Sequence, residues 1–140
     1  MLAQTVAACI VTAATAYHLP PAIIASVLAV EGGIEGSRVH DANGTDDLGP
    51  AQINSIWIDA VAKAAQTSPE EAEHRLQWDG CFNIRVSAAI LRHEIDAAGG
   101  AFWTGVGHYH SHEPDEARRY VDQVVAAARR LFGPRVFAQG

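Results

Sequence analysis

A glutamate at the end of an apolar segment is the residue best suited to acid–base chemistry. The run Val27–Val30 leads to Glu31, and Gly32-Gly33 follows at once. Glycine after a periodic apolar segment marks the C-terminus of a helix, where the negative end of the helix dipole disfavours a carboxylate. Apolar neighbours disfavour the charged form as well. Both effects raise the pKa of Glu31, as a general acid at neutral pH requires; the alternative is a surface glutamate at a fraying helix end.

A second polar stretch, NGTDDLGPAQINSIW at residues 43–57, places carboxylates and amides close together. Asp46 and Asp47 precede a glycine, and Gln52 and Asn54 follow it. A tight turn bearing Asp, followed by a helix whose first turn carries amide side chains, would line a polar groove. The alternatives are that the acids only shape the turn and cap the helix, and that Gln52 is an ordinary residue of a helix surface.

Three histidines, His108, His110 and His112, occupy alternate positions in the sequence HYHSH. Zinc binding would require several of them to converge on one ion, as alternate residues do on a strand. Because a short helix or turn is predicted for residues 101–112, we expect no metal site and no cofactor. Glu35 lies beyond the two glycines in an exposed loop, and we expect no catalytic role for it.

Helices account for most of the elements that position these residues. Proline at first helical positions, glycine after last ones and a capping box at Ser68 mark their ends. The helices are predicted over about residues 2–17, 20–31, 50–66, from 69 onward, 81–97 and 114–132. The 81–97 helix is amphipathic, with Ile84, Ala88, Leu91 and Ile95 on one face. The glycine-rich segment 32–48 is predicted to be loop, with a small hairpin region at about 36–48 around Asn43-Gly44.

Length and composition predict one domain, 1–140, of the mainly α class. Hydrophobic residues make up 49% and charged residues 19%, which excludes a disordered chain, and the net charge of −6 argues against nucleic-acid binding. No apolar run reaches the length of a membrane span. Residues 1–17 contain no Lys or Arg, so we expect the first helix there and no visible signal peptide. Cys9 and Cys81 are either two buried thiols or one disulfide.

Taken in order, four segments resemble the lysozyme superfamily, and more narrowly the small soluble lytic transglycosylases associated with conjugation and secretion machines. The segments are AVEGG, NGTDDLGPAQIN, CFNIRVSAAIL and GVGHYHSHEPDEARRYVDQV, within roughly residues 9–125. Each motif alone is weakly specific, whereas the ordered set is fairly specific. The chain departs from the family pattern at Gly32, at Pro50-Ala51 and at His110-Ser111.

The resemblance implies a lysozyme-like fold and a glycan-strand-cleaving lyase that needs no cofactor. Glu31 would be the catalytic acid, and the residues of the substrate groove would be Asp47, Gln52, Asn54, Tyr109, His110 and, behind the site, Tyr120. Cysteines at the positions of Cys9 and Cys81 imply a disulfide. The implied substrate is peptidoglycan, cleaved between MurNAc and GlcNAc in the periplasm or cell envelope by a monomer that serves a secretion or conjugation machine.

Two alternatives to this function stay open. Asp47 stands where animal lysozymes carry a second carboxylate, and retaining glycosidases hold two carboxyl groups about 5–5.5 Å apart. Glu31 and Asp47 would then make a true muramidase, whereas a transglycosylase can act with Glu31 alone. In the second case Asp47 would only shape the turn, which is the role we favour. The other alternative is a catalytically idle glycan-binding domain in a scaffold.

Overall fold

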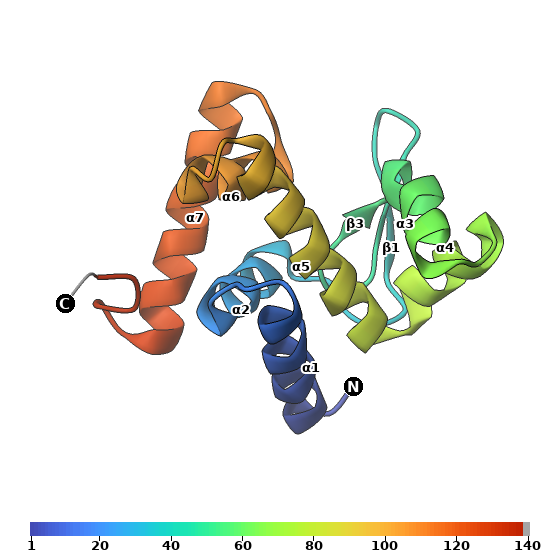
Figure 1. Ribbon diagram of the computed structural model, residues 1–140, viewed down its shortest axis with the longest axis horizontal. Coiled ribbons are helices and arrows are strands. Elements are labelled where there is room, and N and C mark those ends of the chain that lie inside the picture. Colours follow the sequence, from blue (N-terminus) through green and yellow to red (C-terminus); the bar gives the residue numbers. More distant parts are fainter. Residues whose placement is uncertain (139–140) are drawn as a thin grey trace.

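The computed structural model describes residues 1–138, and over these residues it is mainly helical with a small sheet (Figure 1). The helices are α1 (Ala3–Ala16), α2 (Pro21–Glu31), α3 (Ile58–Ala65), α4 (Pro69–Trp78), α5 (Gly80–Ala97), α6 (Phe102–His110) and α7 (Pro114–Phe132), and a 3-10 turn spans Ser55–Trp57. The strands are β1 (Arg38–His40), β2 (Asp46–Leu48) and β3 (Ile53–Asn54). The predicted fold class is confirmed, and the arrangement is consistent with a lysozyme-like fold.

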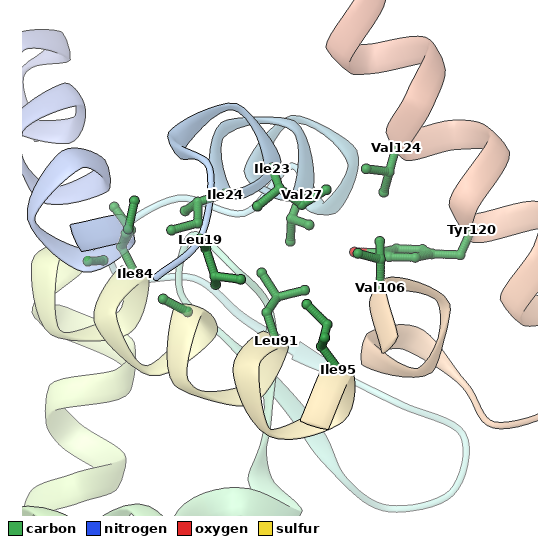
Figure 2. Packing of buried hydrophobic residues seen from close by; sticks show 13 residues of the cluster. Leu19, Ile23, Ile24, Val27, Ile84, Leu91, Ile95, Val106, Tyr120 and Val124 are labelled. Carbon is green, nitrogen blue, oxygen red and sulfur yellow. The ribbon is translucent and has the colours of Figure 1, made fainter. Parts of the chain in front are cut away.

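Helix α5 is the central element, because both hydrophobic clusters pack against it. Ile84, Ala88, Leu91 and Ile95 are all buried, as the amphipathic pattern predicts. They form one cluster with residues from α1, α2, α6 and α7 (Figure 2). The second cluster joins α5 to the sheet, α3 and α4. In Figure 1 these two groups of elements flank α5 on opposite sides.

Local capping signals explain where the helices begin and end. Pro21 opens α2, and Gly32 ends it in a left-handed conformation with φ of 70°. Ser68 caps α4, its hydroxyl accepting a hydrogen bond from the backbone N–H of Glu71. Glu113 caps α7 in the same way through its carboxylate. These ends agree with the sequence predictions to within about two residues, as local signals allow.

The segment 50–66, predicted as one continuous helix, is the main correction. It begins with a turn, continues through β3 and the 3-10 turn, and becomes α-helical only at Ile58. Antiparallel pairing explains the difference: Leu48 pairs with Ile53 across the β2–β3 ladder, and both side chains are buried. The hairpin predicted around Asn43-Gly44 is confirmed, since β1 and β2 are antiparallel and flank this turn.

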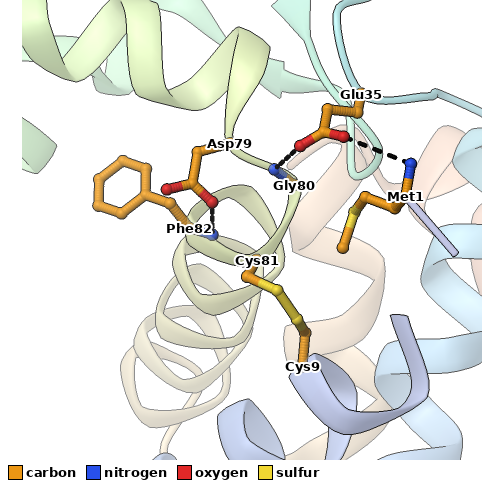
Figure 3. Close-up of a disulfide and its surroundings, with 7 residues drawn as sticks. All are labelled: Met1, Cys9, Glu35, Asp79, Gly80, Cys81 and Phe82. Carbon is orange, nitrogen blue, oxygen red and sulfur yellow. Dashed lines mark hydrogen bonds and ion pairs between the residues drawn. A yellow bond between two sulfur atoms is a disulfide. The ribbon is translucent and has the colours of Figure 1, made fainter. Parts of the chain in front are cut away.

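A disulfide joins α1 to the first turn of α5, between Cys9 and Cys81 (Figure 3). The Cα atoms of the two cysteines lie 5.3 Å apart. Beside it, Glu35 accepts a hydrogen bond of 2.8 Å from the backbone N–H of Gly80 and lies 3.4 Å from the N-terminal amino group. Glu35 therefore has a structural contact at the start of α5. Among residues 1–138, no helix combines the length and apolar character of a membrane span.

Candidate active site

The two glycines after Glu31 bring the end of α2 against the turn that follows β2. Gly32 adopts the left-handed conformation that ends the helix. Gly33 touches this turn so closely that a Cβ atom would overlap the carbonyl oxygen of Gly49 and the side-chain amide of Gln52. The segments AVEGG and NGTDDLGPAQIN therefore meet in space. Because the nearest of these atoms is a backbone oxygen, which a side-chain movement cannot remove, this arrangement requires glycine at position 33.

The turn itself is held by an asparagine of α5. Asn83 is fully buried, and its Oδ1 accepts a 2.8 Å hydrogen bond from the N–H of Ala51. Its Nδ2 donates to the carbonyl oxygens of Leu48 and Leu76, each at 2.8 Å. One side chain thus satisfies three buried backbone groups from two segments. Sequence reasoning gave Asn83 no role of its own, although a lone amide on the apolar face of a helix is a usable signal.

Gln52 belongs to the turn, where the sequence predicts the first turn of a helix. Its φ of 53° is in the left-handed region, and its Nε2 donates a 3.0 Å hydrogen bond to the carbonyl oxygen of Gly49. Asn54, also predicted to be helical, lies on β3 and donates at 3.0 Å to Asp47 Oδ1. Both amides still line the same groove as Glu31. The predicted polar groove is therefore present, although turn and strand build it.

The carboxyl group of Glu31 has a pKa close to neutral pH, so a large share of it is protonated near pH 7. Its pKa is raised from 4.5 to about 7 as the net result of three causes: burial, the largest, raises it, the hydrogen bond from Tyr120 lowers it, and the negative charge of Asp47 raises it. The predicted direction is confirmed, and burial is its main cause. Tyr120 Oη donates to Glu31 Oε2 at 2.7 Å. The pKa of Tyr120 is raised by its own burial and by the charge of Glu31, so the phenol stays a donor.

Aromatic side chains of α6 and α7 form the wall beside Glu31. Tyr120 reaches from α7 toward α2 (Figure 2). The ring of His110 stacks on it, with ring centroids 5.0 Å apart, and Tyr109 lies parallel at 6.3 Å. The hydroxyl group of Tyr109 donates a 3.0 Å hydrogen bond to the carbonyl oxygen of Ala51. This bond ties α6 to the turn that carries Gln52.

Asp47 lies on a strand, and the favoured interpretation of it as a turn residue is wrong. Residues 41–45 make the turn, while Asp47 pairs with Val39 and Asn54 in the middle of the sheet. Because side chains alternate along a strand, Asp47 faces the groove while Asp46 bonds Arg38 and His40 on the other face. Burial and the neighbouring Asp41 raise the pKa of Asp47, against a hydrogen bond from Asn54.

The groove has a volume of about 480 Å³ and a polar lining. It is lined by Glu31, Asp41, Asn43, Asp47, Gln52, Ile53, Asn54, Ile56, Trp57, Ile90, Glu94, His108, Tyr109, His110, Ser111 and His112. Tyr120 stands behind Glu31 and outside this lining. All the sequence-predicted site residues therefore gather at one place. A cleft with hydrogen-bonding side chains along its walls and one protonated acid suits a polar substrate attacked by proton transfer.

His108 and His112 lie in the wall of the groove together with a glutamate that sequence reasoning did not single out. Their rings stack on each other, while His110, between them in sequence, stacks on Tyr120. His110 thus points away from its two neighbours, whereas His108 and His112 come together. A buried glutamate of α5, Glu94, joins the pair at His108 and His112.

The fold and the site together define a mainly α protein, consistent with a lysozyme-like fold, that holds a glutamate of raised pKa beside a polar groove. No family model matches the chain. The chain is similar to Invasion protein IagB of Salmonella typhimurium, in strain SL1344 and in strain LT2. In each comparison, 29% of residues are identical over 102 residues, which cover 70% of this chain. The match spans 60% of the length of these curated relatives.

Proposed function

We propose that the chain is a peptidoglycan lytic transglycosylase that cleaves the β-1,4 bond between MurNAc and GlcNAc. The observation that carries the proposal is Glu31, whose carboxyl group keeps its proton up to about pH 7 beside a groove able to hold a polar strand. The resemblance of the four ordered motifs to this enzyme family supports it. The IagB relatives carry no statement of activity in their name, so they support only a distant kinship.

In the proposed reaction, Glu31 acts first as an acid and then as a base. Its proton passes to the glycosidic oxygen as the bond to the MurNAc anomeric carbon breaks. The substrate's own acetamido group stabilises the cationic sugar. The carboxylate of Glu31 then removes the proton from the C6 hydroxyl group, whose oxygen bonds to the anomeric carbon and closes the 1,6-anhydro ring. Glu31 regains its proton, so the cycle needs neither water nor cofactor.

Tyr120 and Gln52 have supporting roles in this mechanism. The Tyr120 hydroxyl group stabilises the carboxylate that forms after the first proton transfer, because it donates to Glu31 Oε2. The amide of Gln52 lies in the groove wall next to Gly49 and can hydrogen-bond the sugar. His110, stacked on Tyr120, offers a second polar group at the same place.

Product analysis tests the proposal directly. Purified peptidoglycan is digested, and the muropeptides are examined by mass spectrometry. We expect 1,6-anhydromuramic ends, which are lighter by one water than reducing ends. Reducing ends alone would contradict the transglycosylase mechanism.

A true muramidase is the second candidate, and one observation favours it. Asp47 lines the same groove as Glu31, and its charge acts on the pKa of that residue. Asp47 could then stabilise the cationic sugar or attack it while water completes hydrolysis. Asp47→Asn separates the candidates: anhydro products with a modest loss of rate support the single-acid mechanism. Total loss in a folded variant, with reducing ends from the parent, supports the muramidase.

We place the protein in the cell envelope, where it would open the wall locally for a secretion, conjugation or pilus machine. The disulfide between Cys9 and Cys81 fits an oxidising compartment. The relatives' name, an invasion protein, fits a role at the bacterial surface. Zymography distinguishes this function from an idle glycan-binding scaffold: clearing of a peptidoglycan gel supports the enzyme, and pull-down of glycan without clearing supports the scaffold.

A further inference from the structure

A second group of potentially reactive side chains lies in the wall of the same groove. Glu94 comes from α5, His108 from the last turn of α6, and His112 from just beyond that helix. Each offers one donor atom, and the three donor atoms all lie within 4.8 Å of one another. Glu94 Oε2 and His112 Nε2 are already 3.0 Å apart.

The three donor atoms are close enough to share one ion after a local change of side-chain orientation. The rings of His108 and His112 are nearly parallel, at 15°, with centroids 4.2 Å apart. Nitrogen lone pairs lie in the ring plane, and one ion cannot lie in the planes of two stacked rings at once, so one of the two rings must turn before both can bind the same ion. Glu94 is 6% exposed and is fixed by its packing in α5, whereas the side chain of His112 is 68% exposed and free to adjust. Donor atoms in a tetrahedral zinc site lie about 3.3 Å apart, so the present separations of up to 4.8 Å would shorten as the ion binds.

The alternative without a metal is an ion pair between Glu94 and His112, with the ring of His108 stacked on His112. This ion pair accounts for the 3.0 Å contact between Glu94 and His112, but it does not explain why a donor atom of His108 lies within 4.8 Å of both. A buried carboxylate is costly unless it is paired, and an exposed histidine is a weak partner for it because solvent screens the pair. A metal ion would satisfy all three side chains at once. Two imidazoles and one carboxylate, with a fourth position left for water or substrate, are the ligand set of catalytic zinc sites.

We propose that Glu94, His108 and His112 bind one Zn²⁺ ion in the wall of the groove. Imidazole donors favour zinc and its neighbours in the transition series over Mg²⁺ and Ca²⁺, which take oxygen ligands. All three side chains line the groove that holds Glu31, so a fourth coordination position can open onto the groove. A carboxylate of a bound strand can occupy that position. The site goes beyond the proposed glycan cleavage and does not depend on it.

Zinc titration of tag-free, chelator-stripped protein tests the proposal. The measurement is isothermal titration calorimetry with ZnCl₂ at about pH 7.5, where imidazoles are deprotonated as metal binding requires. We expect saturation at one ion per chain. We expect His112→Ala and His108→Ala each to weaken binding by at least about tenfold, because even residues that only support metal ligands typically cost 10–100-fold. His74→Ala is the matched control: His74 is exposed on α4, outside this group, and the variant should bind zinc like the parent.

Cobalt gives a second readout that surface histidines do not reproduce. Co²⁺ in a four-coordinate site with nitrogen and oxygen donors shows strong visible absorption, which should disappear in His112→Ala and persist in His74→Ala. Glu94→Gln should also lose it; because Glu94 is buried, circular dichroism must first show that this variant is folded. Absence of saturable zinc binding, or equal weakening by His74→Ala and His112→Ala, would overturn the proposal. These results are independent of whether the protein cleaves peptidoglycan.

Discussion

Replacing Tyr120 with phenylalanine removes one hydroxyl group and tests how the protein sets the acidity of Glu31. Three influences act on this pKa: burial raises it, the hydrogen bond from Tyr120 lowers it, and the charge of Asp47 raises it. Tyr120 is therefore the one partner among these that favours the charged form. In Tyr120→Phe the lowering influence is lost, so the pKa of Glu31 should rise above about 7.

The size of the shift follows from the strength of the bond. Tyr120 Oη and Glu31 Oε2 are 2.7 Å apart, a short, charge-assisted hydrogen bond. Such bonds contribute about 1.5–3 kcal/mol to stability, and one pKa unit corresponds to about 1.4 kcal/mol. Because water can partly replace the lost hydroxyl group at this half-buried carboxyl, we expect a rise of about one unit.

The assay is the pH dependence of peptidoglycan clearing, with direct titration of the Glu31 carboxyl carbon by NMR. Since the reaction needs protonated Glu31, the rate falls as pH rises through its pKa. The alkaline limb of the profile should therefore move upward by about one unit in Tyr120→Phe. Tyr17→Phe is the matched control, because Arg85 lies over the ring of Tyr17 and the hydroxyl group that bonds Glu31 belongs to Tyr120. An alkaline limb that stays in place, or moves to lower pH, would refute the assignment of Tyr120.

Four further predictions concern catalysis and stability. Glu31→Gln should lower the rate of glycan cleavage by about 10²–10⁴-fold while glycan pull-down persists. As pH rises from 4.5 to about 7, the parent must ionise a buried carboxyl group and loses stability, whereas Glu31→Gln does not. The free energy of unfolding of Glu31→Gln relative to the parent should therefore increase by about 2 kcal/mol over this range, measured by denaturant unfolding at both pH values. Asn83→Ala should lower the free energy of unfolding by about 3 kcal/mol in urea, because three buried backbone groups lose their hydrogen-bond partner. Ser87→Ala, one turn away, removes a single hydrogen bond inside α5 and should lower it by about 1 kcal/mol or less. Reducing the Cys9–Cys81 disulfide, which closes a loop of 72 residues, should cost about 4 kcal/mol, and an unchanged denaturation midpoint would contradict this.

Elements with local signals could be predicted from the sequence. Pro21 and Gly32 mark the two ends of α2 through their own backbone preferences, and Pro114 and Gly133 do the same for α7. The apolar face of α5 follows from helical periodicity alone. Glu31 could be identified because it follows an apolar run and precedes glycine. Such a position predicts burial at the end of a helix, and burial is the main cause of its raised pKa.

The segment after β2 could not be predicted in the same way, because distant residues decide its conformation. Pairing of Ile53 with Leu48 and the hydrogen bonds from Asn83 outweigh the helical preference of the following residues. Asp47 was misjudged for the same reason: its side chain faces the groove only because β2 is a strand. Glu94 and His112 come into contact through the packing of α5 against α6, and their spacing in the sequence does not predict this contact.

The hydrogen bond between Tyr120 and Glu31 has a consequence for the order in which the protein becomes active. The two residues are 89 positions apart, and the Tyr109–Ala51 bond spans 58 positions. During synthesis the chain leaves the ribosome from its N-terminus, so Glu31 emerges long before α7 exists. A nascent chain without α7 has its acid but neither the hydroxyl group that stabilises the carboxylate nor the helix that covers α2. If glycan cleavage is the function, as proposed, it should begin only when the last helix docks, and a fragment ending before residue 114 should be inert even where its first helices fold.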